Sequence, residues 1–254
     1  MLLEGRVAFV SGASRPRGIG RAIALTLARM GADVAVSGWG HFEGAMALAE
    51  EIRGMGRKSI AVKMDVRDYQ EVQKGLARVK EELGAVNILV NNAALMGHNV
   101  PIYKTTVEEW DNEVKICLNS AFYCIKEVWA DMCAQKWGRI VNMTSVAGPM
   151  GGYGQTSYGA AKAGLISLAK SVALEGARFG ITANTVLVGI ANTDAYLVDL
   201  PEEVRQRVEK RTVFGRPAEP QEIANAVAYL VSDEAQYMTG AIMNMVGGLD
   251  LFVF

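Results

Sequence analysis

The feature that most constrains the fold of this chain is the alternation of short apolar runs with longer stretches of helical periodicity. The apolar runs are Val7-Ala8-Phe9-Val10 and those near 34–36, 60–62, 88–90, 140–143, 181–187 and 241–246. Helical periodicity is predicted over 18–30, 42–55, 68–83, 106–135, 157–179, 201–211 and 220–232. Apolar strands separated by helices are typical of a parallel sheet covered on both faces. We therefore expect an α/β fold, and residues 1–254 contain no linker-like tract that would divide them into two domains.

Composition and charge exclude several classes of function. The formal net charge is −1, with acidic and basic residues interspersed, which argues against binding to nucleic acid or membrane. No apolar run reaches the length of a transmembrane helix, and the N-terminus lacks the features of a signal peptide. Cys117, Cys124 and Cys133 lack metal-ligand spacing, so they indicate reduced thiols. The sequence predicts a soluble cytoplasmic protein without a bound metal.

A glycine-rich turn follows the first predicted strand and leads directly into the first predicted helix. It runs Ser11-Gly12-Ala13-Ser14-Arg15-Pro16-Arg17-Gly18-Ile19-Gly20. Glycines let the backbone approach a pyrophosphate, while a helix N-terminus offers free N–H groups and the positive end of its dipole. A plain glycine-rich turn is the alternative for this motif alone. Its position at the first strand-to-helix crossover favours a dinucleotide site.

Tyr158 and Lys162 lie four residues apart in the predicted helix 157–179, which places both side chains on one helical face. A free phenol is a poor acid at neutral pH because its pKa is about 10. A fixed ammonium beside a phenol favours the phenolate, as proton transfer near neutral pH requires. Such pairs also arise by chance on many helices, so the rest of the chain has to decide between the two interpretations.

The glycine-rich turn resembles the opening motif of the short-chain dehydrogenase/reductase family. Gly12, Gly18 and Gly20 match its three glycines, although two extra residues, most simply Pro16-Arg17, lengthen the loop. Further motifs match in order and spacing, so the resemblance covers essentially the whole chain and is strongest to 3-oxoacyl-carrier-protein reductases and related ketoreductases. These motifs are Asp65-Val66, Asn91-Asn92-Ala93-Ala94, Ser145 thirteen residues before Tyr158, and Asn184-Thr185-Val186-Leu187-Val188-Gly189 followed by Thr193.

The resemblance implies a doubly wound Rossmann-type sheet with strand order 3-2-1-4-5-6-7. It also implies hydride transfer between a nicotinamide cofactor and a carbonyl or alcohol. Tyr158 would exchange the proton, Lys162 would favour the phenolate and bind the nicotinamide ribose, and Ser145 would polarise the carbonyl oxygen. The cofactor-binding residues that it implies are Gly12, Ser14, Arg15, Arg17, Gly18, Ile19, Gly20, Ser37, Gly38, Trp39, Asp65, Val66, Asn91, Ala93, Tyr158, Lys162, Gly189 and Thr193.

Two residues depart from the family pattern. Cys117 stands where the family places an asparagine that supports a water in its proton relay, and Val188 stands where proline is usual. Asn119 is not equivalent, because two residues along a helix is a rotation of about 200°. A thiol would hold such a water poorly. Cys117 is therefore predicted to be a small buried hydrophobe, with a redox or nucleophilic role as the alternative.

The end of the second predicted strand favours NADP(H) over NAD(H). An acidic residue there would hold the ribose 2′-hydroxyl of NAD and repel a 2′-phosphate, but Ser37-Gly38-Trp39-Gly40-His41 contains none. Arg15 and Arg17 are suited to a phosphate because a guanidinium binds it through a fork of N–H groups. Trp39 is either an adenine-stacking side chain or a packing residue. His41 is either a phosphate contact or a solvated loop histidine.

Loops beyond the strand ends are expected to line a mainly apolar pocket, which favours a neutral ketone, aldehyde or alcohol. The predicted pocket residues are Met96, His98, Met150, Tyr153, Gln155 and Ile190. Residues 191–215 are polar and helix-prone and form a candidate substrate lid. The apolar tail 249–254 and the predicted helices 106–135 and 157–179 could pair across two-fold axes. We expect a homo-oligomer, and the resemblance implies a homotetramer.

Three hypotheses of function stay open at this point. The first is an NADP(H)-dependent reductase, and the second is a non-catalytic dinucleotide sensor or interaction protein on the same fold. The third is an enzyme with another reaction or cofactor, namely an epimerase, a dehydratase or an NAD-dependent alcohol dehydrogenase. The presence of Ser145, Tyr158 and Lys162 in register favours the reductase.

Overall fold

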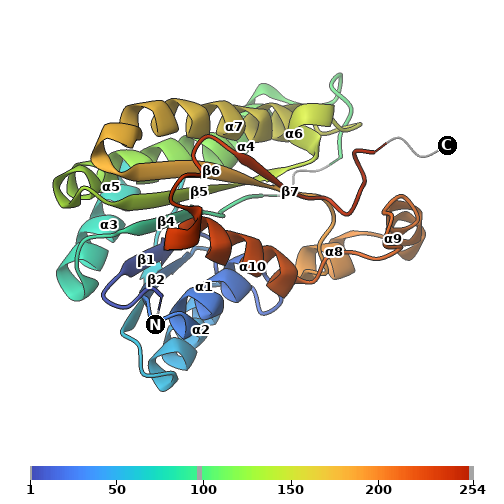
Figure 1. The fold of residues 1–254 in the computed structure, drawn as a ribbon. Coiled ribbons are helices and arrows are strands. Elements are labelled where there is room, and N and C mark those ends of the chain that lie inside the picture. Colours follow the sequence, from blue (N-terminus) through green and yellow to red (C-terminus); the bar gives the residue numbers. More distant parts are fainter. Residues whose placement is uncertain (1, 96–98, 252–254) are drawn as a thin grey trace.

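Within residues 2–95 and 99–251, which the computed structural model describes, seven parallel strands form one sheet in the order β3-β2-β1-β4-β5-β6-β7 (Figure 1). The predicted strand order is therefore confirmed. The order reverses between β1 and β4, and such a switch point opens a crevice at the carboxyl ends of the strands. The strands are β1 (Val7–Val10), β2 (Asp33–Gly38), β3 (Ser59–Lys63), β4 (Ile88–Asn91), β5 (Gly138–Ser145), β6 (Ile181–Val188) and β7 (Ile242–Met245).

Helices cover both faces of this sheet (Figure 1). One hydrophobic core lies under α1 (Ile19–Arg29), α2 (Phe42–Gly54) and α10 (Pro220–Val231). Another core lies on the opposite face, under α3 (Tyr69–Leu83), α5 (Ser120–Gln135) and α7 (Thr156–Gly176). Because successive side chains of a strand point to opposite faces, a strand covered on both sides needs apolar residues throughout.

The predicted helix 106–135 is helical from Val107 to Gln135, but its hydrogen-bond pattern changes in the middle. It consists of α4 (Val107–Val114), a π-helical turn over Lys115–Asn119, and α5. Cys117 lies in the π-helical turn, and such turns are frequent at functional sites. Hydrophobic periodicity does not detect one extra residue in a helical turn, so this π-helical turn could not be predicted from the sequence.

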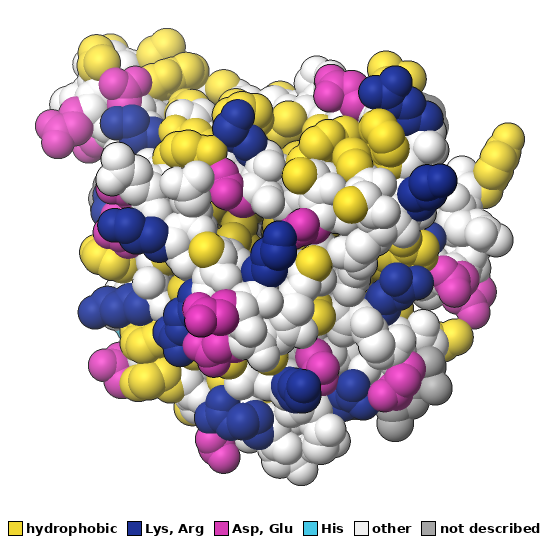
Figure 2. Space-filling view, turned by 90° about the vertical axis from the view of Figure 1, so that its left-hand side faces the viewer, with side chains coloured by type: hydrophobic (Ala, Val, Ile, Leu, Met, Phe, Trp, Pro, Cys, Tyr) yellow, Lys and Arg dark blue, Asp and Glu magenta, His cyan; other side chains and the backbone are white. Residues whose placement is uncertain are grey.

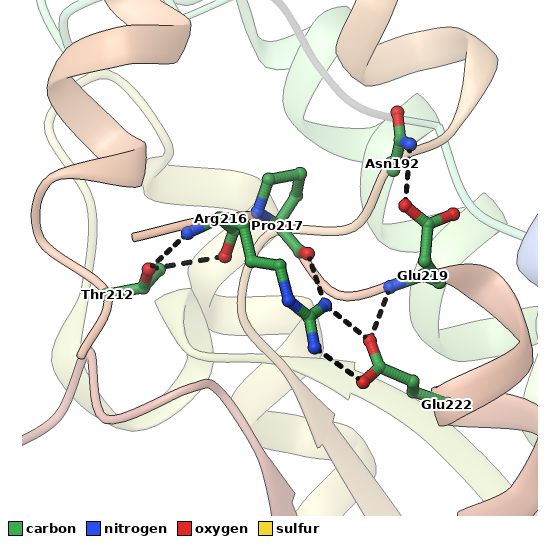
Figure 3. Close-up of polar contacts among 6 residues, drawn as sticks. All are labelled: Asn192, Thr212, Arg216, Pro217, Glu219 and Glu222. Carbon is green, nitrogen blue, oxygen red and sulfur yellow. Dashed lines mark hydrogen bonds and ion pairs between the residues drawn. The ribbon is translucent and has the colours of Figure 1, made fainter. Parts of the chain in front are cut away.

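The candidate lid, residues 191–215, contains α8 (Asp194–Asp199) and α9 (Glu202–Glu209) and is tied to α10 near both of its ends (Figure 3). Both terminal nitrogens of Arg216 donate to the Glu222 carboxylate, at 2.7 and 2.8 Å. At the other end, Asn192 Nδ2 donates to Glu219 Oε1 at 2.8 Å. Hydrogen bonding from Arg216 lowers the pKa of Glu222 to about 2, so this ion pair persists to acidic pH.

The remaining helical element near the site is α6 (Ala147–Met150), a single turn that was not predicted from the sequence.

On the face shown in Figure 2, acidic and basic side chains are interspersed, and neither sign forms a continuous patch. Within the described residues, no helix combines the length and apolar character needed to cross a bilayer.

The N-terminus of α3 offers a test of the local structure. The Asp68 side chain accepts hydrogen bonds from the backbone N–H groups of Gln70 and Glu71, at 2.7 and 3.3 Å. Asp68→Ala removes this cap and is expected to lower the free energy of unfolding by about 1 kcal/mol. Asp68→Asn keeps an acceptor at the cap and should stay close to the parent. Urea unfolding followed by circular dichroism measures both, and an Asp68→Ala midpoint equal to the parent's would contradict the capping role.

Candidate active site

Ser145, Tyr158 and Lys162 come together at the carboxyl end of the sheet. Ser145 is the last residue of β5, and Tyr158 and Lys162 lie on consecutive turns of α7. All three line a cavity of about 180 Å³, which is closed on other sides by the ends of β5 and β6 and by residues between 189 and 200. Lys162 Nζ lies 5.5 Å from the centroid of the Tyr158 ring. The arrangement places a positive charge beside the phenol, as the spacing of these residues in the sequence predicts.

Backbone contacts hold Lys162 in a buried position. The side chain is 3% exposed, and its Nζ donates to the backbone oxygen of Met143 at 2.8 Å. The backbone oxygen of Lys162 accepts from Thr144 Oγ1 at 2.7 Å, so β5 and α7 are joined in both directions. An ammonium carries three donors, so donors remain for groups that enter the cavity.

Ser145 is oriented by the turn that follows it. The backbone N–H of Ala147 donates to Ser145 Oγ at 3.2 Å. Because this contact uses the hydroxyl as an acceptor, the hydroxyl proton is available to a carbonyl oxygen in the cavity. A donor aimed at the oxygen on which negative charge develops is the usual electrostatic device of such sites.

A groove of about 520 Å³ adjoins this cavity and crosses the ends of β1, β2, β3 and β4. Ile19, Asn92, Ala94 and Thr193 line both spaces, so the groove and the cavity are continuous. The predicted cofactor residues that line the groove are Gly12, Ser14, Arg15, Gly18, Ile19, Gly20, Ser37, Gly38, Trp39, Asp65, Val66, Ala93 and Thr193. An extended groove at the first crossover, ending at the proposed acid, suits a dinucleotide.

The glycine-rich loop lies so close to the neighbouring chain that side chains would clash. Gly12 has a φ of 67°, and a Cβ atom there would lie 2.7 Å from the Cα of Ala93. A Cβ at Gly20 would lie 2.5 Å from Asn92 Nδ2. These glycines therefore allow the loop to close on the end of β4, and the N-terminus of α1, which suits a phosphate, lines the groove at Ile19 and Gly20.

Other predicted cofactor residues lie elsewhere. The Arg17 side chain does not line the groove, and its backbone N–H donates to Asp194 Oδ2 on α8 at 2.8 Å. Asn91 is buried and donates from Nδ2 to Asn142 Oδ1 at 2.8 Å, inside the sheet. Gly189 lines the smaller cavity beside Tyr158.

The predicted substrate residues are only partly brought together. Ile190 lines the cavity, whereas Met150 and Tyr153 are exposed, Tyr153 to 86%. Gln155 is half-buried just before α7. Met96 and His98 lie outside the described residues.

Two basic residues near these spaces, Arg67 and Lys63, were not predicted from the sequence. Arg67 lines the groove, where its Nε donates to Asp65 Oδ1 at 2.9 Å and its Nη1 donates to Asn112 Oδ1 at 2.7 Å. Hydrogen bonding from Arg67 lowers the pKa of Asp65. Lys63 Nζ lies 5.7 Å from the centroid of the Trp39 ring, at the same end of the groove. The position of Arg67, two residues after Asp65, was the available signal for it.

Cys117 is a buried thiol between the groove and α7. It is 1% exposed, and its Sγ lies 3.7 Å from the backbone oxygen of Leu95. Burial raises the pKa of this thiol, the positive charge of Lys162 opposes the rise, and the charge of Glu113 adds to it. The net direction is upward, so the reactive thiolate is disfavoured. Across residues 2–95 and 99–251, no group of three or more His, Cys, Asp or Glu side chains could hold a metal ion.

Comparisons with known proteins agree with this arrangement. A family model described as enoyl-(acyl carrier protein) reductase matches residues 12–250. The 3-oxoacyl-(acyl-carrier-protein) reductase FabG of Escherichia coli K12 is 41% identical over 249 residues, which cover 98% of this chain and 99% of that protein. FabG of Staphylococcus epidermidis RP62A is 39% identical over 242 residues, covering 95% and 98%.

A solved structure is similar over the same length. The crystal structure of a candidate gluconate dehydrogenase from Agrobacterium tumefaciens matches with a TM-score of 0.92 at 31% identity, covering 99% of this chain and 98% of that one. The solved structure therefore shares the fold described above over nearly its whole length. This chain belongs to the short-chain dehydrogenase/reductase family, and it is an oxidoreductase.

Proposed function

We propose that this protein is an NADP(H)-dependent ketoreductase that transfers a hydride between the nicotinamide and the carbonyl carbon of a neutral small molecule. The observation that carries the proposal is the convergence of Ser145, Tyr158 and Lys162 on one cavity continuous with the groove. A dinucleotide sensor would need the groove but not this cavity. The sequence also offers no additional acid/base pair of the kind that an epimerase or dehydratase would use.

The side chains have separate roles in this reaction. The bound nicotinamide supplies or accepts the hydride. Ser145 donates its hydroxyl proton in a hydrogen bond to the carbonyl oxygen, where negative charge develops during reduction. Tyr158 transfers its phenolic proton to that oxygen and completes the alcohol, and it removes the proton in the reverse direction. Lys162 stabilises the phenolate that is left behind, because its ammonium is fixed beside the ring.

The charge at the adenosine end of the groove supports NADP(H). No acidic residue lies at the end of β2, and Arg15 lines the groove. Lys63 adds a positive charge beside Trp39, while the nearby carboxylate of Asp65 is engaged by Arg67. A 2′-phosphate therefore meets positive charge at this end, and no acid at β2 repels it.

The walls of the cavity support a neutral, largely apolar substrate. Val188, Ile190, Ala191, Tyr196 and Leu200 line it beside Tyr158. The names of the curated relatives suggest 3-oxoacyl thioesters, and that of the structural neighbour suggests a sugar acid. The apolar walls favour the acyl class.

Residues 191–215 would act as the lid over the substrate cavity. We also expect the protein to be cytoplasmic and to form a homotetramer.

Tyr158→Phe tests the proposed acid. It removes the phenolic proton and keeps the ring, so turnover in carbonyl reduction is expected to fall by about 10² or more. NADPH affinity, measured by the fluorescence of the bound nicotinamide, should stay within a few-fold. Tyr237→Phe is the matched control, because Tyr237 is 100% exposed. Turnover of Tyr158→Phe within a few-fold of the parent would rule out Tyr158 as the acid.

Arg15→Ala tests the cofactor preference. A charge-assisted hydrogen bond contributes about 1.5–3 kcal/mol, so the NADPH dissociation constant should rise about tenfold or more. The NADH constant should change little, and Arg17→Ala should have a smaller effect than Arg15→Ala because its side chain does not line the groove. A parent that prefers NADH, or equal losses for both cofactors, would overturn the assignment. Gly38→Asp is a poorer test, since a Cβ there lies 2.9 Å from Ser14 Cβ.

Cys117→Ala tests whether the thiol takes part in the chemistry. Because the thiol is buried and held neutral, activity should stay within a few-fold of the parent, and Cys117→Asn should preserve or raise it. Iodoacetamide should modify the half-buried Cys133 before Cys117, as mass spectrometry of tryptic peptides can show. Loss of most activity in a folded, NADPH-binding Cys117→Ala protein would instead assign the thiol a chemical role.

A further inference from the structure

Glu113, on α4, is the only buried acidic side chain among the described residues, and the mechanism above does not use it. It is 7% exposed. Its Oε2 accepts a hydrogen bond from Ser157 Oγ, whereas its Oε1 has no hydrogen-bond partner within the described part of the chain. A buried acceptor without a partner destabilises the folded state. Such an acceptor is therefore expected to bind water or to have a function.

A cavity of about 160 Å³ lies against this carboxyl group. It is large enough to hold water. Leu95 and Asn112 line both this cavity and the cofactor groove, and Leu95 is exposed at the surface. The cavity therefore adjoins the groove and reaches toward solvent.

Two contacts relate Glu113 to the proposed acid and its ammonium. Ser157, which donates to Glu113, directly precedes Tyr158 on α7. The charges of Glu113 and Lys162 both act on the buried thiol of Cys117, so both groups lie near it. The thiol itself is held neutral, which makes it a poor proton carrier. Glu113 is thus a buried carboxyl group on this side of the site, whereas Glu109, which also lines the cavity, is exposed.

We propose that Glu113, together with Ser157 and water in this cavity, conducts the proton that Tyr158 exchanges in each turnover between the buried site and solvent. The inference rests on the proposed reductase function. In reduction, the new alcohol oxygen takes its proton from Tyr158. The phenolate that remains then regains a proton, which reaches it past Lys162. The Glu113 carboxyl group gives a proton inward and recovers one from water. One proton enters from solvent in each turnover, and no electron moves along this route.

Glu113→Gln tests the proposal because the amide keeps the size and the contact to Ser157 but neither gives nor takes a proton. We expect kcat to fall about tenfold or more, with KM and NADPH affinity within twofold of the parent. Acetate or imidazole at increasing concentration should restore the rate by carrying protons, and Glu113→Asp should restore part of it. Glu108→Gln, on an exposed position of the same helix, is the matched control.

The same variant separates conduction from a structural role. A parent-like kcat in Glu113→Gln overturns the proposal, as does a lower kcat that small acids do not restore. The melting temperature of Glu113→Gln should be no lower than the parent's, because the substitution replaces a buried carboxyl group that already lacks a full set of partners. A lower melting temperature together with an unrestored rate would show that Glu113 serves stability alone.

A measurement without turnover allows a failure of this proposal to be distinguished from a failure of the proposed function. Calorimetric titration with NADPH, in two buffers of different ionisation enthalpy, gives the number of protons exchanged on binding. We expect this number to differ between the parent and Glu113→Gln, and identical numbers overturn the proposal. A parent that reduces no carbonyl compound with either cofactor would instead contradict the proposed function.

Discussion

The contact on which the site depends is the hydrogen bond from the buried ammonium of Lys162 to the backbone oxygen of Met143. Burying an ammonium is unfavourable unless it is bonded, so this contact fixes where α7 lies against β5. Tyr158 lies one turn earlier on the same helix, and Ser145 ends the same strand. One buried charge therefore sets the position of the proposed acid relative to the hydroxyl group that would polarise the carbonyl.

The groove depends on a second constraint, the close approach of the glycine-rich loop to the end of β4. Gly12 and Gly20 leave no room for a side chain against Ala93 and Asn92. The parallel sheet places these strand ends at one edge, at the switch point of the strand order. The long groove and the short catalytic cavity meet there, which brings a bound cofactor and a substrate within reach of each other.

Much of this could be predicted from the sequence, because the signals were local or repeated. Apolar strands buried on both faces predict the sheet, and the spacing of Ser145, Tyr158 and Lys162 predicts their convergence. The π-helical turn at Lys115–Asn119 leaves no trace in hydrophobic periodicity. Likewise, Glu113 stands between Asn112 and Val114 on a polar helix, where a carboxylate is expected to be solvated, and only the packing of α7 buries it.

The burial of Glu113 is best understood together with Cys117. The thiol takes the position that the family gives to an asparagine, and burial favours its neutral form, so it adds neither a good water ligand nor a proton carrier. If Tyr158 is the acid, as proposed, the proton that it gives up has to be replaced from solvent, because Lys162 is enclosed. A carboxyl group one turn before Cys117, with an unpartnered oxygen beside a cavity of about 160 Å³, meets that need at some cost in stability. Such a cost is what functional groups in folded proteins commonly impose, and it explains why an acid is found in a position where an apolar side chain would pack better.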